Sequence, residues 1–134
     1  AAHKELPNNV KLVVADCGYT SFDKELVHCA PGPKWFGNIL VVFVNLFLKV
    51  FRKIDLKKTN ALEAVKNITL PTLIVHGNDD KFVPTYMGKQ LYDACASKDK
   101  ELLIVDGAKH ARSIAVDPEN YEKAITKFTD KYIK

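Results

Sequence analysis

The sequence predicts an α/β protein, a three-layer domain in which a mainly parallel sheet of about three strands is flanked by helices. Apolar runs at residues 10–15, 72–76 and 101–105 are β-branched or leucine-rich, and a polar or glycine-containing loop follows each. Continuous apolar runs of this length are typical of strands covered on both faces. Helical patterns lie between the runs, and this alternation indicates βαβ units with right-handed crossovers.

Two of the flanking helices can be placed from their apolar spacing. Residues 86–96 carry apolar side chains near helical spacing. Residues 118–133 present one apolar stripe, formed by Tyr121, Ile125, Phe128 and Tyr132. Asp117 is suited to cap the start of this second helix, because Asp accepts hydrogen bonds from first-turn amides, and Pro118 suits the first helical position.

The composition describes one folded domain, residues 1–134. A chain of 134 residues with 47% hydrophobic and 27% charged residues has the size and composition to form a packed core. The net charge of +4 is modest and the lysines are spread along the chain, which argues against a nucleic-acid-binding surface.

The cysteines bear on the cellular compartment. Cys17, Cys29 and Cys95 are odd in number, widely spaced and form no CxxC pair, which favours reduced thiols, a cytoplasmic location and no metal knuckle. The first residues, AAHKELPNN, lack the charged-then-apolar plan of a signal peptide. An anchor upstream of these residues is left open.

The segment at about residues 32–66 differs from the rest and is expected to be a variable, cap-like helical region. Residues 35–51 are almost wholly apolar, relieved by Asn38, Asn45 and Lys49. Their number is at the lower end of the transmembrane range, so we expect a helix that is buried against the sheet or caps a cleft, rather than membrane contact. Residues 55–68 read as a polar connection and a short helix, with Leu62 and Val65 turned inward.

Polar side chains follow the second predicted strand. That strand ends at His76 and Gly77, and the chain then presents Asp79 and Asp80 before a helix begins near Pro84. Loops at the carboxyl ends of parallel strands are where α/β sheets place functional groups, and a carboxylate there can orient an imidazole. Alternatively, the two aspartates only cap a turn and a helix.

A histidine follows the third predicted strand. His110 lies in the loop VDGAKHARS, residues 105–113. A loop histidine can be mere surface, but its ordinary pKa near 6.5 suits proton transfer at neutral pH. Because neighbouring parallel strands bring their carboxyl-end loops side by side, contact between an aspartate of the previous loop and His110 is geometrically reasonable.

These two loops together resemble those of the α/β-hydrolases. The pattern HGxxDxxVP at residues 76–84 resembles their acid loop, and GAKHAxS at residues 107–113 resembles their histidine loop. Residues 117–128 are similar to the last helix of one bacterial branch of serine hydrolases, and residues 10–22 to the strand and loop that follow its nucleophile helix. The resemblance spans nearly the whole chain and is weakest over residues 32–52.

The resemblance implies that Asp80 is the acid and His110 the general base of a catalytic triad. Asp79 is a local competitor for the acid, and Asp16 at the end of the first strand is a second. Lys109 stands where the family usually has glycine, and a cation beside the base could lower its pKa or alter the loop. The implied substrate is a small ester or acyl compound, with no cofactor and no metal.

The triad nucleophile is not recognisable in this sequence. The family places its serine in a GxSxG elbow, and Ser21, Ser97 and Ser113 are not flanked in this way. Cys17 is the remaining candidate, although a buried inert thiol is the favoured interpretation. We therefore expect the C-terminal part of a serine hydrolase of the esterase or acyl-hydrolase type, which begins just after the nucleophile helix and has no turnover alone.

The sequence also predicts self-association and leaves two functions other than catalysis open. A sheet cut from a larger one leaves an unpaired edge, so self-association through the first strand is expected. A flavodoxin-like module that binds a ligand or partner without catalysis is the alternative function. A lipid-contacting element built around residues 35–51 is a third hypothesis.

Overall fold

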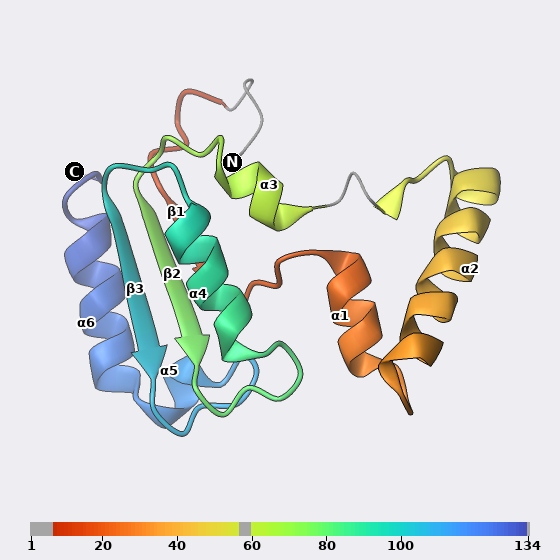
Figure 1. The fold of residues 1–134 in the computed structure, drawn as a ribbon. Coiled ribbons are helices and arrows are strands. Elements are labelled where there is room, and N and C mark those ends of the chain that lie inside the picture. Colours follow the sequence, from red (N-terminus) through yellow and green to blue (C-terminus); the bar gives the residue numbers. More distant parts are fainter. Residues whose placement is uncertain (1–6, 57–59, 134) are drawn as a thin grey trace.

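The computed structural model describes residues 7–56 and 60–133. Within them, β1 (Val13–Asp16), β2 (Thr72–Gly77) and β3 (Lys100–Val105) form a parallel sheet in the order β1-β2-β3 (Figure 1). The predicted parallel sheet is therefore confirmed, and the carboxyl ends of all three strands lie at the same edge.

The first strand begins at Val13 rather than at Val10. The amide of Val10 donates to the carbonyl of Pro7 in a turn (3.0 Å), and the amide of Val13 donates to the carbonyl of Pro71 (2.8 Å). Because Pro71 has no amide hydrogen, it cannot return the next hydrogen bond of the ladder, and pairing starts at Val13 and Thr72.

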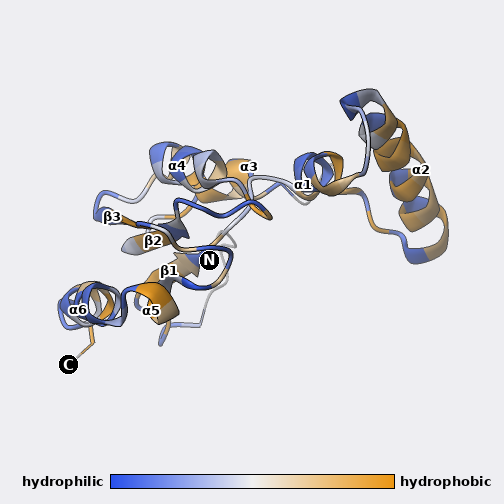
Figure 2. Ribbon diagram, turned by 90° about the horizontal axis from the view of Figure 1, so that it is seen from below, coloured by the Kyte–Doolittle hydropathy of each residue, from blue (hydrophilic) through white to orange (hydrophobic). Residues whose placement is uncertain are grey.

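Helices cover both faces of the sheet, as predicted for a three-layer arrangement (Figure 2). On one face lie α4 (Thr85–Ala94) and α3 (Ala61–Val65), and on the other lie α6 (Pro118–Thr129) and α5 (Ser113–Val116). Every residue of the central strand β2 is buried. The main core cluster joins strands, histidine loop and α6 through Leu73, Val75, Val105, Ala108 and Phe128.

Helix α6 forms for the reasons that its sequence indicates. Asp117 caps it by accepting a hydrogen bond from the amide of Asn120 (3.2 Å), and Pro118 occupies its first turn. Phe128 is completely buried, and Tyr121 and the rest of the predicted stripe pack against the same core. The α-helix ends at Thr129, four residues before the predicted end, and turns continue to residue 132.

The apolar segment at residues 35–51 does form a helix, α2 (Lys34–Arg52), but it is not buried against the sheet, so that alternative is wrong. The other alternative, a helix that caps a cleft, stays a prediction. Helix α2 pairs with α1 (Phe22–Cys29), a helix that apolar spacing did not reveal, and the two stand apart from the sheet (Figure 2). Gly37 is the only buried residue of α2. Since α3 and α4 already cover the nearer face of the sheet, α2 finds no place there. Leu62 and Val65 of α3 are partly buried, as expected.

Candidate active site

The acid loop follows β2 and is held by the side chain of Asp80. This side chain is buried, and its Oδ1 accepts hydrogen bonds from the backbone amides of Phe82 (3.0 Å) and Val83 (2.9 Å). These bonds fix the turn that leads into α4. The turn-capping interpretation of this aspartate is therefore correct for one of its two oxygens.

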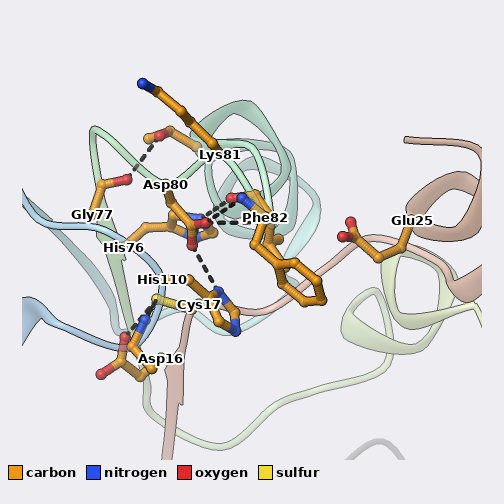
Figure 3. Close-up of polar contacts among 12 residues, drawn as sticks. Asp16, Cys17, Glu25, His76, Gly77, Asp80, Lys81, Phe82 and His110 are labelled. Atoms are coloured by element: carbon orange, nitrogen blue, oxygen red, sulfur yellow. Dashed lines mark hydrogen bonds and ion pairs between the residues drawn. The ribbon is translucent and has the colours of Figure 1, made fainter. Parts of the chain in front are cut away.

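The other oxygen of Asp80 faces the histidine loop. Its Oδ2 lies 2.9 Å from Nδ1 of His110 (Figure 3). The Asp80 side chain is fully enclosed, whereas the imidazole of His110 is 38% exposed. The ring of His110 packs against that of Phe82, with the ring centres 4.9 Å apart and the planes tilted by 55°. When Nδ1 carries a proton it donates to the carboxylate, which leaves Nε2 at the opposite side of the ring as the acceptor.

The two loops are joined by backbone contacts around Gly77 and Asn78. A Cβ on Gly77 would lie 2.1 Å from the carbonyl oxygen of Ala108, so only glycine allows this approach. The amide of Asn78 donates to Val105 O (3.0 Å), its side-chain oxygen accepts from the amide of Gly107 (2.6 Å), and its side-chain nitrogen donates to Asp106. Asn78 therefore ties the loops together, a role that its place in a turn did not suggest.

A second histidine, His76 of β2, lies next to the carboxylate of Asp80. His76 is completely buried in β2, and its Nε2 lies 2.9 Å from Val83 O and 3.4 Å from Oδ2 of Asp80. A proton on Nε2 donates to Val83 O, and the carboxylate of Asp80 lies just beyond this hydrogen bond. The other ring nitrogen has no hydrogen-bond partner and faces Gly88, where a Cβ would lie 2.5 Å from it. The sequence showed His76 only as part of the strand end, not as a support for the carboxylate.

The electrostatic balance at Asp80 favours the carboxylate. Burial by itself raises the pKa of Asp80, but the hydrogen bond from His110, the amides of Val83 and Phe82 and the charge on His110 together lower it below its ordinary value. The carboxylate is thus ionised at neutral pH and is placed to hold the imidazole and to stabilise a positive charge on it.

The competing acids are engaged elsewhere. Asp79 is partly exposed and its carboxylate lies 3.7 Å from the ammonium group of Lys81. Asp16 accepts hydrogen bonds from Tyr121 Oη (3.1 Å) and from the thiol of Cys17 (3.1 Å). Among the residues that the structure describes, Asp80 is the aspartate that contacts His110. Lys109 is exposed, and the loop that contains it still brings the histidine to the acid.

Cys17 lies beside the pair but is a poor nucleophile. It has a positive φ of 53° after β1, and its sulfur accepts a hydrogen bond from the amide of Ala111 (3.2 Å). Burial raises the pKa of this thiol to about 11, although the Ala111 bond opposes the shift and Asp16 adds to it. The thiol is therefore protonated at neutral pH.

Cys17, Asp80 and His110 each offer a metal-ligand atom, and these atoms lie within 4.8 Å of one another. Thiolate, carboxylate and imidazole are ligands that zinc accepts. A metal bound there through Asp80 Oδ2 and His110 Nδ1 would have to replace the hydrogen bond between them. The arrangement of these two residues therefore fits proton transfer better than metal binding.

None of the chain's three serines is exposed. Ser21, Ser97 and Ser113 are all buried, and Ser97 Oγ donates to Asp99 O (2.8 Å).

A second buried carboxylate near the site belongs to Glu25 of α1. It faces the space beside Phe82 and His110 in Figure 3, and one of its oxygens lies 3.2 Å from the thiol of Cys29. The described residues thus hold an acid and a base but no accessible serine.

The parallel sheet with an acid and a histidine after successive strands defines the α/β-hydrolase class of proteins. The family model described as "Serine aminopeptidase, S33" matches residues 40–117, more than half of the chain. The chain therefore belongs to the serine aminopeptidase S33 family of α/β-hydrolases.

Individual proteins are similar to this chain over most of its length. The uncharacterized protein YqkD of Bacillus subtilis is 26% identical over 121 residues, which are 87% of this chain and 38% of that protein. The esterase Pf2001 of Pyrococcus furiosus superposes with a TM-score of 0.64 at 23% identity, covering 93% of this chain and 46% of the esterase. An esterase domain from Rhodothermus marinus gives a TM-score of 0.65 at 18% identity, with 95% and 52% covered.

At these identities the structural likeness shows the fold alone. The chain spans 38% of YqkD and 46% of the Pyrococcus esterase, which is less than half of each. The family match supports the resemblance that the two loop motifs indicated, and this chain is a portion of an α/β-hydrolase.

Proposed function

We propose that Asp80 and His110 are the acid and the general base of a serine hydrolase that acts on carboxylic esters or related acyl compounds. The observation that carries this proposal is the 2.9 Å contact between the buried carboxylate and Nδ1 of a partly exposed imidazole. A buried acid that holds one nitrogen of a partly exposed imidazole is an arrangement suited to general-base catalysis. The esterases with the same fold support the choice of substrate class.

In this mechanism Asp80 orients the ring and stabilises its protonated form. Nε2 of His110 takes the proton from a serine hydroxyl as the hydroxyl attacks the ester carbonyl, and it then passes the proton to the departing alcohol. Water repeats the sequence to release the acid. The serine and the oxyanion-hole amides are supplied by residues outside these 134, because the sequence has no GxSxG motif and its own serines are buried.

The test compares hydrolysis of p-nitrophenyl acetate and butyrate by this chain and by a protein extended upstream in the gene. We expect turnover only by the extended protein. There, Asp80→Asn should lower kcat by about 10⁴-fold, because the amide favours the tautomer with the proton on Nε2 and no longer stabilises a positive charge on the ring. Asp79→Asn is the matched control and should retain activity, since Asp79 lies beside Lys81 rather than His110.

Other outcomes would point elsewhere. Turnover by this chain alone that is lost with His110→Ala would contradict the proposal of an external nucleophile and would make Cys17 the next residue to replace. An extended protein that binds acyl compounds but never hydrolyses them would support the non-catalytic binding module instead.

We also propose that this chain self-associates through the open edge of β1. Among the described residues β1 pairs only with β2, and Val14 on this edge strand is 39% exposed. An open strand edge favours pairing with another strand. Sedimentation velocity at micromolar concentration should show dimers or larger species, and a strictly monomeric chain would refute the proposal.

A further inference from the structure

Helix α2 presents a broad apolar face that no described residue covers. The side chains of this face are between 45% and 66% exposed and recur every three or four residues: Trp35, Ile39, Val42, Phe43, Leu46 and Val50. Spacing of this kind places them on one side of the helix. A contiguous exposed patch of this size is unusual in a soluble protein and marks an interaction surface.

The remaining two sides of α2 have different characters. One side is covered by α1, where a Cβ on Gly37 would lie 3.1 Å from Cα of Val27. A narrow strip between the covered side and the apolar side is polar and basic: Lys34, Asn38, Asn45, Lys49 and Arg52. The strip runs the length of the helix. A helix with an apolar face beside a basic strip is the pattern of a helix that lies in the plane of a membrane surface.

By length and composition α2 could also cross a bilayer. Its contacts with the returning chain argue against crossing. The amide of Leu56 donates to Oδ1 of Asn45 (2.9 Å), the amide of Ile54 donates to Leu48 O (3.1 Å), and Lys49 pairs with Asp55 at 3.0 Å. The polar backbone of residues 53–56 therefore runs beside the second half of the helix. Irregular backbone is not stable in hydrocarbon, so this half cannot be a membrane core segment.

The charge around the apolar face identifies the kind of surface. Residues 26–54 contain no aspartate or glutamate, and they contain Lys34, Lys49, Arg52 and Lys53. Each basic residue near an anionic leaflet adds attraction, and aromatic residues such as Trp35 favour the interface. We propose that α2 docks flat on an anionic lipid bilayer, with its apolar face inserted among the headgroups and its basic strip beside the lipid charges. This proposal is independent of the proposed hydrolase function.

Trp35 makes the proposal directly measurable, because it is the only tryptophan of the chain and is 64% exposed. Adding vesicles of phosphatidylcholine with phosphatidylserine should shift its emission to shorter wavelength, and the protein should pellet with the vesicles. Pure phosphatidylcholine vesicles should bind the protein more weakly by about tenfold, since the electrostatic part of the affinity is lost.

Three variants connect binding to the face. Phe43→Asn/Leu46→Asn removes apolar area without changing charge and should weaken binding by about tenfold or more. Lys34→Gln/Arg52→Gln should remove most of the preference for anionic vesicles. Ile133→Asn is the matched control, because Ile133 is equally exposed at 57% but lies outside α2, and it should bind normally.

The depth of tryptophan probes in the bilayer distinguishes a helix that lies on the surface from one that crosses the membrane. Quenching by brominated lipids should place the natural Trp35 and the tryptophan of a Trp35→Phe/Phe43→Trp variant at the same shallow depth. A much deeper position for the mid-helix probe would show a spanning helix and would overturn flat docking.

The remaining results would also overturn the proposal. These are no pelleting with anionic vesicles, equal pelleting by Phe43→Asn/Leu46→Asn, or self-association through α2 that anionic vesicles do not reverse. A further one is binding that this chain shows but the protein extended upstream in the gene lacks, because the added residues would then cover the face.

Discussion

The sheet region with its site and the α1–α2 pair differ in how far their apolar side chains are buried. In the sheet region, β2 is buried at every position and Phe128 of α6 is completely enclosed. In α2, an almost wholly apolar run has one buried residue, Gly37. The difference shows that hydrophobicity determines whether a segment can be buried, whereas the neighbours available to it determine whether it is buried.

The same contrast separates the polar groups. The carboxylate of Asp80 is enclosed and shared between two amides and His110, so its position is fixed by several bonds at once. The polar strip of α2 mostly faces solvent, and its pair between Lys49 and Asp55 is partly exposed. Such exposed pairs contribute little stability. The position of α2 therefore depends mainly on its packing with α1 and on the hydrogen bonds from the amides of Leu56 and Ile54.

The largest expected effect comes from replacing a buried phenylalanine of the sheet region and comparing it with an exposed one of α2. Phe128→Ala should lower the free energy of unfolding by about 3–5 kcal/mol, because it leaves a cavity in the core. Phe43→Ala, at a side chain that is 64% exposed, should change it by less than about 0.5 kcal/mol. Urea denaturation followed by circular dichroism measures both, and equal losses would mean that the face of α2 is covered.

The second prediction concerns glycine. Gly77→Ala should destabilise the protein by about 3 kcal/mol, since its Cβ would overlap the backbone of Ala108 and part the acid loop from the histidine loop. Gly37→Ala has a milder contact, 3.1 Å to Val27, and α1 can yield because it packs mainly on α2. Thermal melting should therefore rank Gly77→Ala well below Gly37→Ala, and the reverse ranking would contradict the close approach of the two loops.

Thiol reactivity gives a third comparison. Cys29 of α1 is exposed, whereas Cys17 is buried. Burial raises the pKa of both thiols, that of Cys17 to about 11, and Glu25 adds to the rise at Cys29. At pH 8, Ellman's reagent should modify Cys29 faster than Cys17 by about tenfold or more, because only an accessible thiolate reacts. Single replacements, Cys29→Ser and Cys17→Ser, assign the fast and slow phases, and a fast phase that disappears with Cys17→Ser would refute the assignment.

The smallest expected effect is a dependence of stability on acid pH. Although burial opposes it, the bonds to Asp80 lower its folded-state pKa below the unfolded value. The stabilisation from these bonds is therefore present above about pH 4 and is lost as the pH falls through the folded-state pKa. Asp80→Asn should reduce the loss of unfolding free energy between pH 6 and pH 3, whereas Asp79→Asn should leave it closer to that of the natural protein.

Much of the site follows from local sequence and sheet topology. Apolar runs followed by polar loops placed Asp79, Asp80 and His110 at the same edge of a parallel sheet. The resemblance of HGxxDxxVP to the acid loop of the α/β-hydrolases favoured Asp80 over Asp79. The structure brings this pair together. It also adds what spacing could not show, because His76 and Asn78 act through contacts between strands and loops that are distant in sequence.

The sequence by itself determined the elements whose causes are local: the β-branched strands, the capped start of α6 at Asp117 and Pro118, and the helical form of residues 34–52. Tertiary structure alone decided that one oxygen of Asp80 binds the amides of Phe82 and Val83 while the other contacts His110. It also decided that the apolar face of α2 points away from the sheet. Periodicity and capping depend on neighbours within one or two turns, whereas burial depends on which surfaces remain uncovered once the sheet has its helices. In this chain α3 and α4 cover the near face of the sheet, and α2 is left facing outward.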